Sequence, residues 1–271
     1  MAKTKKQRSG RRLSVLGVLA LLAAVLLLVG VLRSGEGVTV RQTGQEDTLA
    51  LPINVRKAED FLTDEYGHIQ YVGALAGVDV SAHQGAIDWA RVKAAGVDFA
   101  IIRAAYRGYG VGGLIEDECF RQNLEGARAA GVQVGLYFFS QAISEAEAEE
   151  EADYIVSLLG GEALDYPIYF DWEEVSEEGS RTRNMGTYEV GNYALAFCKR
   201  ITEAGYAAGV YFNQRYGYTI MQLEQLADYS FWLAEYREAP SFLYDFDVWQ
   251  YTGQGTVDGI ETIVDLDLFF P

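Results

Sequence analysis

Cysteine, histidine and proline are scarce in this chain of 271 residues. The two cysteines, Cys119 and Cys198, are too few for a disulfide-stapled mini-domain or a four-cysteine zinc site. They fall on separate predicted helices, so we expect free thiols rather than a disulfide. The two histidines, His68 and His83, leave little for a zinc hydrolase, and four prolines argue against a proline-rich scaffold.

Basic residues are also few outside the N-terminus. Seven of the 22 lysines and arginines lie in the first 34 residues, which contain no Asp or Glu, so residues 35–271 keep 15 basic and 39 acidic side chains and a net charge of −24. Phosphate contacts need a basic surface, so nucleic acid is excluded as a partner. Hydrophobic residues make up 49% of the chain, which is enough for a large folded core.

An uncharged segment, residues 13–32, follows the basic N-terminus. It reads LSVLGVLALLAAVLLLVGVL, and as a transmembrane helix it would span roughly 30 Å, the thickness of the hydrocarbon core of a bilayer. Six basic residues precede it, which by the positive-inside rule gives a cytoplasmic tail at 1–12 and places the acidic body outside the cell membrane. A cleaved signal peptide is the alternative and would give a secreted protein, but the apolar run is long for one and no clear cleavage motif follows. A buried soluble helix is disfavoured because every face is apolar.

The rest of the chain divides into a linker and a folded domain. Residues 33–75 are polar with weak periodicity, so we expect a stalk before a domain at 76–271. In that domain, short apolar runs rich in β-branched and aromatic residues alternate with helical patterns that often end on glycine. The eight predicted strands are 76–81, 99–106, 132–140, 166–174, 207–213, 230–236, 247–252 and 264–270. The predicted helices are 87–96, 117–131, 144–161, 187–205 and one near 219–227.

This alternation predicts an α/β fold in which parallel strands are joined by right-handed crossovers. Eight strands in a domain of this size favour a modified TIM-like (β/α) barrel, and the short connections between the last three strands predict fewer than eight helices. An open doubly wound sheet is the main alternative. The segment around the first strand, GVDVSAHQG, lacks the glycine pattern of a phosphate-binding loop, which argues against nucleotide binding.

Acidic residues recur where the barrel strands would end, the position at which such barrels carry catalytic groups. Asp171 and Glu173 lie two residues apart at the end of the fourth strand and so point to the same face. Asp79 ends the first strand and Asp265 lies on the last. These strands are neighbours in a closed barrel, so the two carboxyl groups should approach each other. Crowding raises the pKa of at least one carboxyl group, which keeps a proton available for the cleavage of a glycosidic bond.

The same acids have other interpretations. Carboxylates at strand ends also cap helices or bind cations, and a calcium or magnesium site could use the same side chains. Spacing alone does not separate these interpretations.

Five sequence blocks resemble, in content and order, the family 25 glycoside hydrolases, which are the Chalaropsis-type lysozymes or N-acetylmuramidases. The blocks are GVDVSAHQGAIDW (77–89), YPIYFDWE (166–173), FWLAEY (231–236), VWQYTGQGTVDGI (248–260) and VDLDLF (264–269). The resemblance covers residues 76–271. Each block alone is weak, but five blocks in order on the predicted strands are specific.

The resemblance implies hydrolysis of the β-1,4 bond between N-acetylmuramic acid and N-acetylglucosamine in peptidoglycan, on a barrel with fewer than eight helices. By motif, Glu173 resembles the general acid. Asp171 would orient or stabilise the 2-acetamido group of the substrate, if that group is the internal nucleophile. Asp79 and Asp265 resemble the supporting acids that tune Glu173 and position the substrate. No metal ion or cofactor is expected.

Aromatic residues on or near the strand ends fit a sugar-binding cleft, because flat rings can stack on pyranoses. The candidates are Tyr137, Tyr211, Trp232, Tyr236 and Trp249, with Gln250 as a donor to a sugar hydroxyl. Core packing for the rings, and a strand-end hydrogen bond for Gln250, are equally good interpretations. His83 is given no catalytic role.

Two positions depart from the family pattern. Phe138 stands where many members have a histidine after the tyrosine, so a polar contact would be missing. Asp267 stands where asparagine is common and adds an acid near the site. These departures bear on the pH optimum more than on the reaction.

Three hypotheses follow. The preferred one is a membrane-anchored muramidase that remodels the cell's own wall, with peptidoglycan glycan strands as its substrate and with residues 13–32 in the membrane. The second is a non-catalytic barrel that binds wall glycan, although all four acids are present. The third is a different barrel hydrolase, either chitinase-like or metal-dependent.

Overall fold

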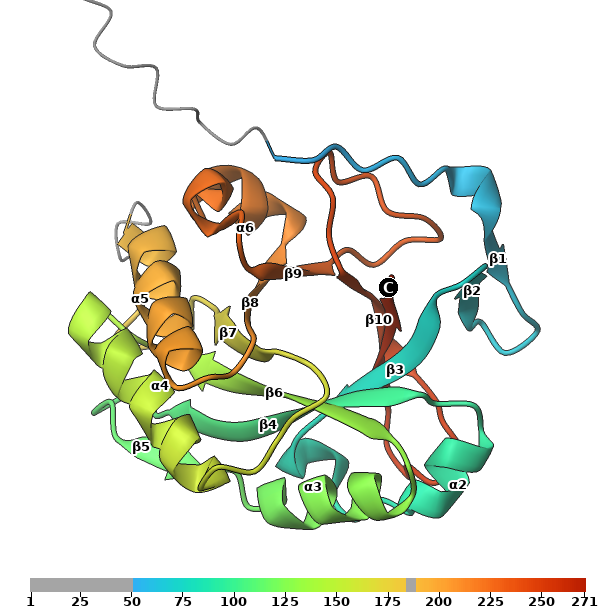
Figure 1. The fold of residues 1–271 in the computed structure, drawn as a ribbon, viewed down its shortest axis with the longest axis horizontal. Helices are drawn as coiled ribbons and strands as arrows, with labels where there is room; N and C mark the ends of the chain where they lie inside the picture. The colour runs from blue at the N-terminus through green and yellow to red at the C-terminus, as the bar shows by residue number, and fades with distance from the viewer. Residues whose placement is uncertain (1–50, 184–188) are drawn as a thin grey trace, which may run out of the picture. The chain divides into compact units, whose positions relative to one another are not determined.

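The computed structural model describes residues 51–183 and 189–271, whose main sheet closes into a barrel (Figure 1). Eight strands form the ring, and β3 pairs with both β4 and β11 to close it. They are β3 (Leu75–Val80), β4 (Phe99–Arg107), β6 (Gln133–Ser140), β7 (Ile168–Trp172), β8 (Ala208–Asn213), β9 (Ser230–Ala234), β10 (Val248–Gly255) and β11 (Val264–Phe269). A further strand, β5 (Leu114–Glu116), pairs antiparallel with β4. The predicted eight-stranded barrel is confirmed, and the open-sheet alternative is wrong.

The last strand runs against its neighbours. The pairs from β3 through β10 are parallel, whereas β11 is antiparallel to both β10 and β3. Only residues 256–263 connect β10 to β11, which is too short for the crossover that a parallel pair requires. The predicted parallel pairing therefore holds for the first seven barrel strands and fails at the eighth.

Helices lie outside the ring and cover only part of it (Figure 1). Each of the first five barrel strands is followed by one, namely α2 (Trp89–Ala94), α3 (Phe120–Ala129), α4 (Glu145–Leu159), α5 (Val190–Glu203) and α6 (Gln214–Thr219). Short 3-10 helices η2 (Ala82–Gln84) and η4 (Leu223–Leu226) complete two of the connections. No helix lies in the fully described stretch 230–271. The expectation of fewer than eight helices agrees with this arrangement.

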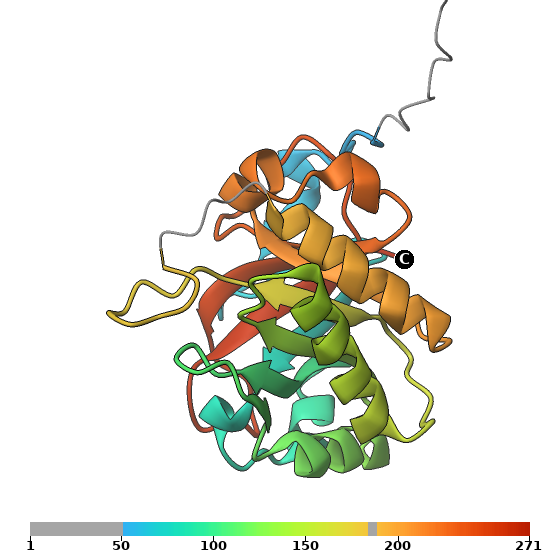
Figure 2. The ribbon, with the colours of Figure 1, turned by 90° about the vertical axis from the view of Figure 1, so that its left-hand side faces the viewer.

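The ends of α4 show how the sequence sets a helix boundary. The side chain of Ser144 accepts a hydrogen bond from the backbone N–H of Glu147, which satisfies one of the free donors of the first turn. Gly160 ends the helix in the left-handed conformation, with φ 58°. Figure 2 shows α4 and α5 side by side across the outside of the sheet.

Alternation along the strands sorts the side chains into an inner and an outer layer. The outer layer packs between the sheet and the elements that cover it. Inside the barrel, aromatic rings fill the end at which the parallel strands begin. The rings of Phe99, Tyr166 and Phe269 contact one another there, with centroids 4.8 to 6.2 Å apart. That end is therefore packed, and the opposite end remains for a functional site.

Residues 51–75 pack on the barrel instead of forming the predicted stalk. They contain η1 (Ala58–Asp60) and a hairpin of β1 (Phe61–Thr63) with β2 (Ile69–Tyr71). The buried ring of Phe61 meets Trp249 edge-on at 5.2 Å, and Arg56 pairs with Asp245 at 2.5 Å. Because none of the helices in the described residues covers β10 and β11, the apolar outer faces of these strands need another partner, and the hairpin supplies it. The folded unit therefore begins well before residue 76.

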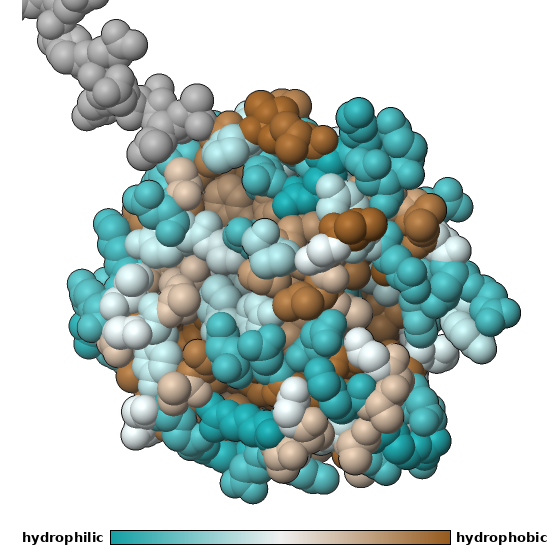
Figure 3. All heavy atoms as spheres, turned by 45° about the vertical axis from the view of Figure 1, so that its right-hand side comes forward, coloured by the Kyte–Doolittle hydropathy of each residue, from teal (hydrophilic) through white to brown (hydrophobic). Residues whose placement is uncertain are grey.

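The other N-terminal predictions lie outside the described residues. These are the tail at 1–12, the apolar segment at 13–32 and the first part of the predicted stalk, 33–50. Within the described part of the chain, no helix is both long enough and apolar enough to span a bilayer. Figure 3 shows one face of the molecule, on which exposed hydrophobic side chains lie in small groups among hydrophilic ones.

Candidate active site

The four predicted acids meet at the end of the barrel where the parallel strands finish. Asp79 on β3 and Asp265 on β11 are direct partners across the antiparallel ladder, as expected from closure of the barrel. Asp171 lies on β7, and Glu173 follows the last residue of that strand. The charges of Glu173 and Asp265 both act on the carboxyl group of Asp171. Three strands thus bring these acids within electrostatic range of one another.

Burial raises the pKa of the carboxyl groups in this cluster. For Asp171, loss of hydration is the main cause, repulsion from Glu173 adds to it, and the guanidinium of Arg103 opposes it. The pKa of Glu173 is raised by burial first and by Asp265 second, and the neighbouring hydroxyl of Tyr211 opposes the shift. Burial also raises the pKa of Asp265. The cluster therefore retains protons towards neutral pH, as an acid catalyst requires.

Asp267 is a fifth acid and lies beneath the others. It is buried inside the barrel, where Oδ1 accepts a hydrogen bond from the indole of Trp232 at 2.9 Å. Burial, with repulsion from Asp265, raises the pKa of Asp267 to about 8. The charge of Asp267 in turn adds to the effect of burial in raising the pKa of Asp79. The extra acid noted in the sequence is therefore part of the site and is electrostatically coupled to Asp79.

Gln250 joins both sides of the site. Its Nε2 donates to Asp79 Oδ2 at 2.7 Å, and its Oε1 accepts from the hydroxyl groups of Tyr211 at 3.1 Å and Tyr236 at 2.9 Å. The side chain is buried and its carbonyl oxygen already has two donors. Gln250 therefore organises the site, and a direct contact with a sugar hydroxyl, as predicted, is not supported by this arrangement.

The predicted aromatic residues divide by exposure. Tyr236 is 60% exposed, so its side chain is accessible to a ligand. Tyr137 and Tyr211 are largely buried inside the barrel and line the floor of the site. Trp232 is 1% exposed, with its ring 4.7 Å from that of Tyr211, so it supports the floor and cannot stack on a sugar. Only Tyr236 of these four is placed for stacking.

Trp249 and Phe138 face away from the site. Trp249 is fully buried on the outer face of β10, where it packs against Phe61 and donates to the backbone oxygen of Glu235 at 2.8 Å. The predicted sugar contact for Trp249 is therefore wrong. Phe138 is buried in the outer core layer. A polar side chain at position 138 would not reach the acids, so the missing contact has no consequence for them.

Arg103 is a cation that the sequence analysis missed. It lies on β4 among apolar residues, and its Nε donates to Asp117 Oδ2 at 2.8 Å. Its guanidinium lies 5.2 Å from the ring centre of Tyr106. An arginine on an otherwise apolar barrel strand is unusual, since arginine is rarely buried without a partner. That anomaly in FAIIRAAY could have identified it.

A buried glutamine holds the chain at Glu173. Gln141 Nε2 donates to the backbone oxygen of Glu173 at 2.6 Å and to that of Ser140 at 2.9 Å. Its Oε1 accepts a hydrogen bond from Thr182 Oγ1 at 2.8 Å. Thr182 Oγ1 in turn accepts one from the backbone N–H of Val175 at 3.1 Å. Gln141 and Thr182 are both fully buried, and we call this pair the Gln141–Thr182 latch. Nothing local marks them in the sequence, because the contact spans 41 positions.

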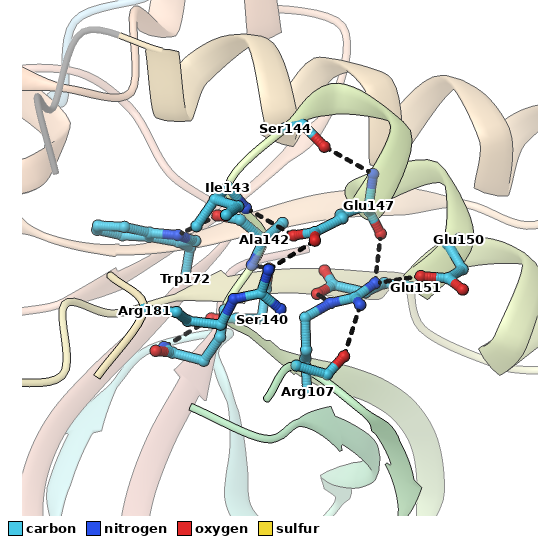
Figure 4. A network of polar contacts seen from close by, with 12 residues as sticks. Arg107, Ser140, Ala142, Ile143, Ser144, Glu147, Glu150, Glu151, Trp172 and Arg181 are labelled. Carbon is cyan, nitrogen blue, oxygen red and sulfur yellow. Dashed lines mark hydrogen bonds and ion pairs between the residues drawn. The ribbon is translucent and has the colours of Figure 1, made fainter. Parts of the chain in front are cut away.

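An ion-pair network ties the same loop to α4 (Figure 4). Arg181, which precedes Thr182, pairs with Glu147 at 2.6 Å. On the other side, the buried Arg107 of β4 pairs with the buried Glu151 at 2.7 Å. Burial nevertheless raises the pKa of Glu151 to about 7. The loop that follows the Glu173 strand is thus anchored to α4, and α4 is in turn tied to β4 through Arg107.

The described residues contain no group of three or more His, Cys, Asp or Glu side chains suited to hold a metal ion. Cys119 and Cys198 are both free, as predicted, and Cys198 is buried. Cys119 is only partly buried.

Known proteins resemble this chain in sequence and in fold. "Autolytic lysozyme" of Clostridium acetobutylicum is 25% identical over 201 residues, which are 72% of this chain and 56% of that protein. "Lysozyme M1" of Streptomyces globisporus is 29% identical over 206 residues, which are 71% of this chain and 67% of that protein. The crystal structure of the bacterial lysozyme from Streptomyces coelicolor superposes with a TM-score of 0.62 at 28% identity, covering 73% of this chain and 92% of that one.

The chain spans little more than half the length of the clostridial relative. The sequence model of glycosyl hydrolases family 25 matches residues 78–260, which is more than half of the chain and includes most of the barrel. The match also contains Asp79, Asp171 and Glu173. On the extent of this match, the chain belongs to glycosyl hydrolases family 25.

Proposed function

We propose that this protein is a peptidoglycan N-acetylmuramidase, which hydrolyses the β-1,4 bond between N-acetylmuramic acid and N-acetylglucosamine. The observation that carries the proposal is the cluster of buried acids with raised pKa at the open end of a family 25 barrel. Glycoside hydrolysis needs a protonated carboxyl group at the leaving oxygen and negative charge near the developing oxocarbenium ion. This cluster offers both.

Glu173 is the general acid in this proposal. It lies beyond the end of β7 and is less buried than Asp171, so it is the member of the pair that a substrate can reach. Two neighbouring carboxyl groups keep a proton between them, because a second negative charge is costly in a buried site. Glu173 donates that proton to the glycosidic oxygen as the bond breaks.

Asp171 acts on the sugar in the same step. Its Oδ1 is buried and has no hydrogen-bond donor among the described residues, so it is available to a donor on the substrate. The 2-acetamido N–H of the sugar is such a donor, and a carboxylate there would orient this group as internal nucleophile. Asp79 and Asp265 complete the site, with Asp79 held by Gln250 at 2.7 Å.

The test is digestion of purified peptidoglycan by the full chain, with mass spectrometry of the products. Wild type should create new reducing ends on N-acetylmuramic acid, and Glu173→Gln should lose activity by roughly 10²- to 10⁴-fold. Glu178→Gln, an exposed acid of the same loop, is the matched control and should keep full activity. Addition of EDTA to the wild type tests the metal-dependent alternative, because loss of activity with the chelator would favour a metal-dependent hydrolase. Measurable binding with intact glycan in every reaction would instead favour the non-catalytic wall-binding module.

The location of the protein is part of the same proposal. We infer that residues 13–32 anchor the chain in the cell membrane with the barrel outside, because the segment is uncharged and six basic residues precede it. Such an anchor would confine the enzyme to wall close to the membrane and suit it to remodelling. Protease added to intact cells should degrade the barrel and leave a membrane-bound fragment, whereas a soluble, fully secreted barrel would contradict the anchor.

A further inference from the structure

A cavity of about 540 Å³ opens beside the acid cluster. Its walls include Arg103, Tyr106, Tyr109, Phe139, Ser176 and Glu177. We call it the Arg103 pocket. A larger cavity of about 740 Å³ lies against α2 and α3, but it is not lined by the residues that follow Glu173 in the chain. No role described above uses the Arg103 pocket.

The Arg103 pocket adjoins the acid cluster: none of the acids lines it, but Glu174 and Val175, which directly follow Glu173 in the chain, do. Phe139 on β6 is the strand partner of Asp171, and Tyr106 on β4 is the strand partner of Phe139. The charge of Arg103, on the pocket wall, also acts directly on the carboxyl group of Asp171. A group bound in this pocket must therefore be attached to, or next to, the sugar that the acids contact.

The chemistry of the wall is not that of a simple sugar subsite. Among the described residues, Arg103 uses only Nε in a protein hydrogen bond, and its two terminal nitrogens have none. A guanidinium matches a carboxylate or an amide carbonyl. The rings of Tyr106, Tyr109 and Phe139 add apolar surface, and Glu177 adds an acidic group at the rim. The pocket thus combines a cation, an apolar wall and an anion.

One part of peptidoglycan carries groups that complement these three features. N-acetylmuramic acid differs from N-acetylglucosamine by a lactyl group, whose carboxyl group carries the stem peptide. That peptide presents carbonyl oxygens, alkyl side chains and an amino group in sequence. A cavity of about 540 Å³ lies in the size range of pockets that hold drug-sized ligands and exceeds what a three-carbon lactyl group fills.

We propose that the Arg103 pocket binds the lactyl-linked stem peptide of a muramic acid unit beside the scissile bond. The inference rests on the proposed function and adds to it a preference for glycan that still carries peptide. Arg103 faces the carbonyl oxygen of the lactyl group, and the three rings enclose the first residues of the peptide.

Binding to the full chain in detergent tests the proposal, with calorimetry of two small probes. Muramyl dipeptide should bind roughly tenfold more tightly than N-acetylmuramic acid, because both probes offer an oxygen to Arg103 but only the dipeptide buries alkyl groups against the three rings. Tyr109→Ala and the pocket-filling Ser176→Trp should both abolish the difference. Tyr66→Ala is the matched control, since Tyr66 is 74% exposed on the N-terminal hairpin loop and Tyr109 is 54% exposed. Equal affinity of the wild type for both probes would overturn the proposal, as would equal weakening of both by Tyr109→Ala.

Hydrolysis separates this inference from the proposed function. If peptide-bearing glycan and amidase-stripped glycan are cleaved with the same KM, the pocket does not bind the stem peptide, although the muramidase function stands. If muramyl dipeptide is bound selectively and neither glycan is cleaved, the function is wrong and the peptide pocket remains. The muramidase function and the peptide pocket are both supported if the wild type has a higher KM for stripped glycan than for peptide-bearing glycan. Tyr109→Ala should then leave the KM for stripped glycan unchanged.

Discussion

Removal of the Thr182 hydroxyl tests whether the buried latch controls Glu173. In Thr182→Val the side chain keeps its branched shape, but Gln141 Oε1 loses its donor at 2.8 Å and the backbone N–H of Val175 loses its acceptor at 3.1 Å. A buried polar group without a partner costs about 1–3 kcal/mol. Gln141 is fully buried, whereas Val175 is only half-buried. We therefore expect a loss of about 2 kcal/mol in the free energy of unfolding and a melting temperature lower by roughly 4–8 °C.

The effect on catalysis should exceed what this loss of stability explains. Gln141 is oriented by Thr182 and holds the backbone oxygen of Glu173 at 2.6 Å. A displacement of about 1 Å at a catalytic group can lower the rate by about 10²-fold. At 25 °C, well below the melting temperature, kcat on peptidoglycan should fall at least tenfold in Thr182→Val. KM should change less than kcat, because neither latch residue lines the cavity beside the acids and, of the residues that do, Val175 loses only a backbone hydrogen bond.

Two variants make this reasoning refutable. Thr182→Ser keeps the hydroxyl group and should recover most of the kcat. Thr219→Val removes a hydroxyl that donates to a backbone oxygen on α6, away from Glu173, and should leave kcat unchanged. An unchanged kcat in a destabilised Thr182→Val would mean that the latch only stabilises the fold.

Three further predictions concern pH, packing and substrate affinity. The pKa of Asp267 is about 8 in the fold against an ordinary value near 3.8, so the folded chain binds more protons and stability should fall as pH rises from about 4 to about 8. Asp267→Asn should flatten this slope in melting curves recorded across that range, and an unaltered slope would contradict the assignment. Phe61→Ala should cost about 3 kcal/mol in a denaturant titration without lowering kcat, because the ring packs on Trp249 and lies far from the chemistry. Tyr236→Ala should raise KM for glycan about tenfold, whereas Tyr236→Phe, which loses only the bond to Gln250, should raise it less; equal effects would mean that the ring does not stack.

The barrel could be predicted because its signals are local. Runs such as FAIIRAAY and VQVGLYFFS mark buried strands wherever they lie, and glycines mark the ends of the helices between them. Closure of eight such strands then predicts that Asp79 and Asp265 approach each other, and the register pairs them directly. The direction of β11 depends instead on the length of its connection. That length was visible in the sequence but was used only to predict missing helices.

The side of a strand on which a residue lies is also predictable, and for Trp249 it contradicts a place in the site. Side chains alternate along a strand, so Trp249 and Gln250 must point to opposite faces. Gln250 bonds to Asp79 inside the barrel at 2.7 Å, and Trp249 must therefore face outwards. The same alternation separates Phe138 from its neighbour Tyr137. An assignment of one strand residue to the site should have excluded its immediate neighbours.

The N-terminal hairpin and the latch could not be predicted in this way, because each is defined by what the rest of the fold leaves unsatisfied. Phe61 lies in a polar stretch, and its ring is buried because no helix among the described residues covers β10 and β11. In the sequence Gln141 is an ordinary residue after a strand. Its role depends on contacts with Glu173 and Thr182, which lie far along the chain. Catalytic acids must occupy fixed strand ends and so recur in a recognisable pattern. The residues that hold them in position are subject to no such rule, since any buried donor of suitable length can fill the place, and only the three-dimensional structure identifies them.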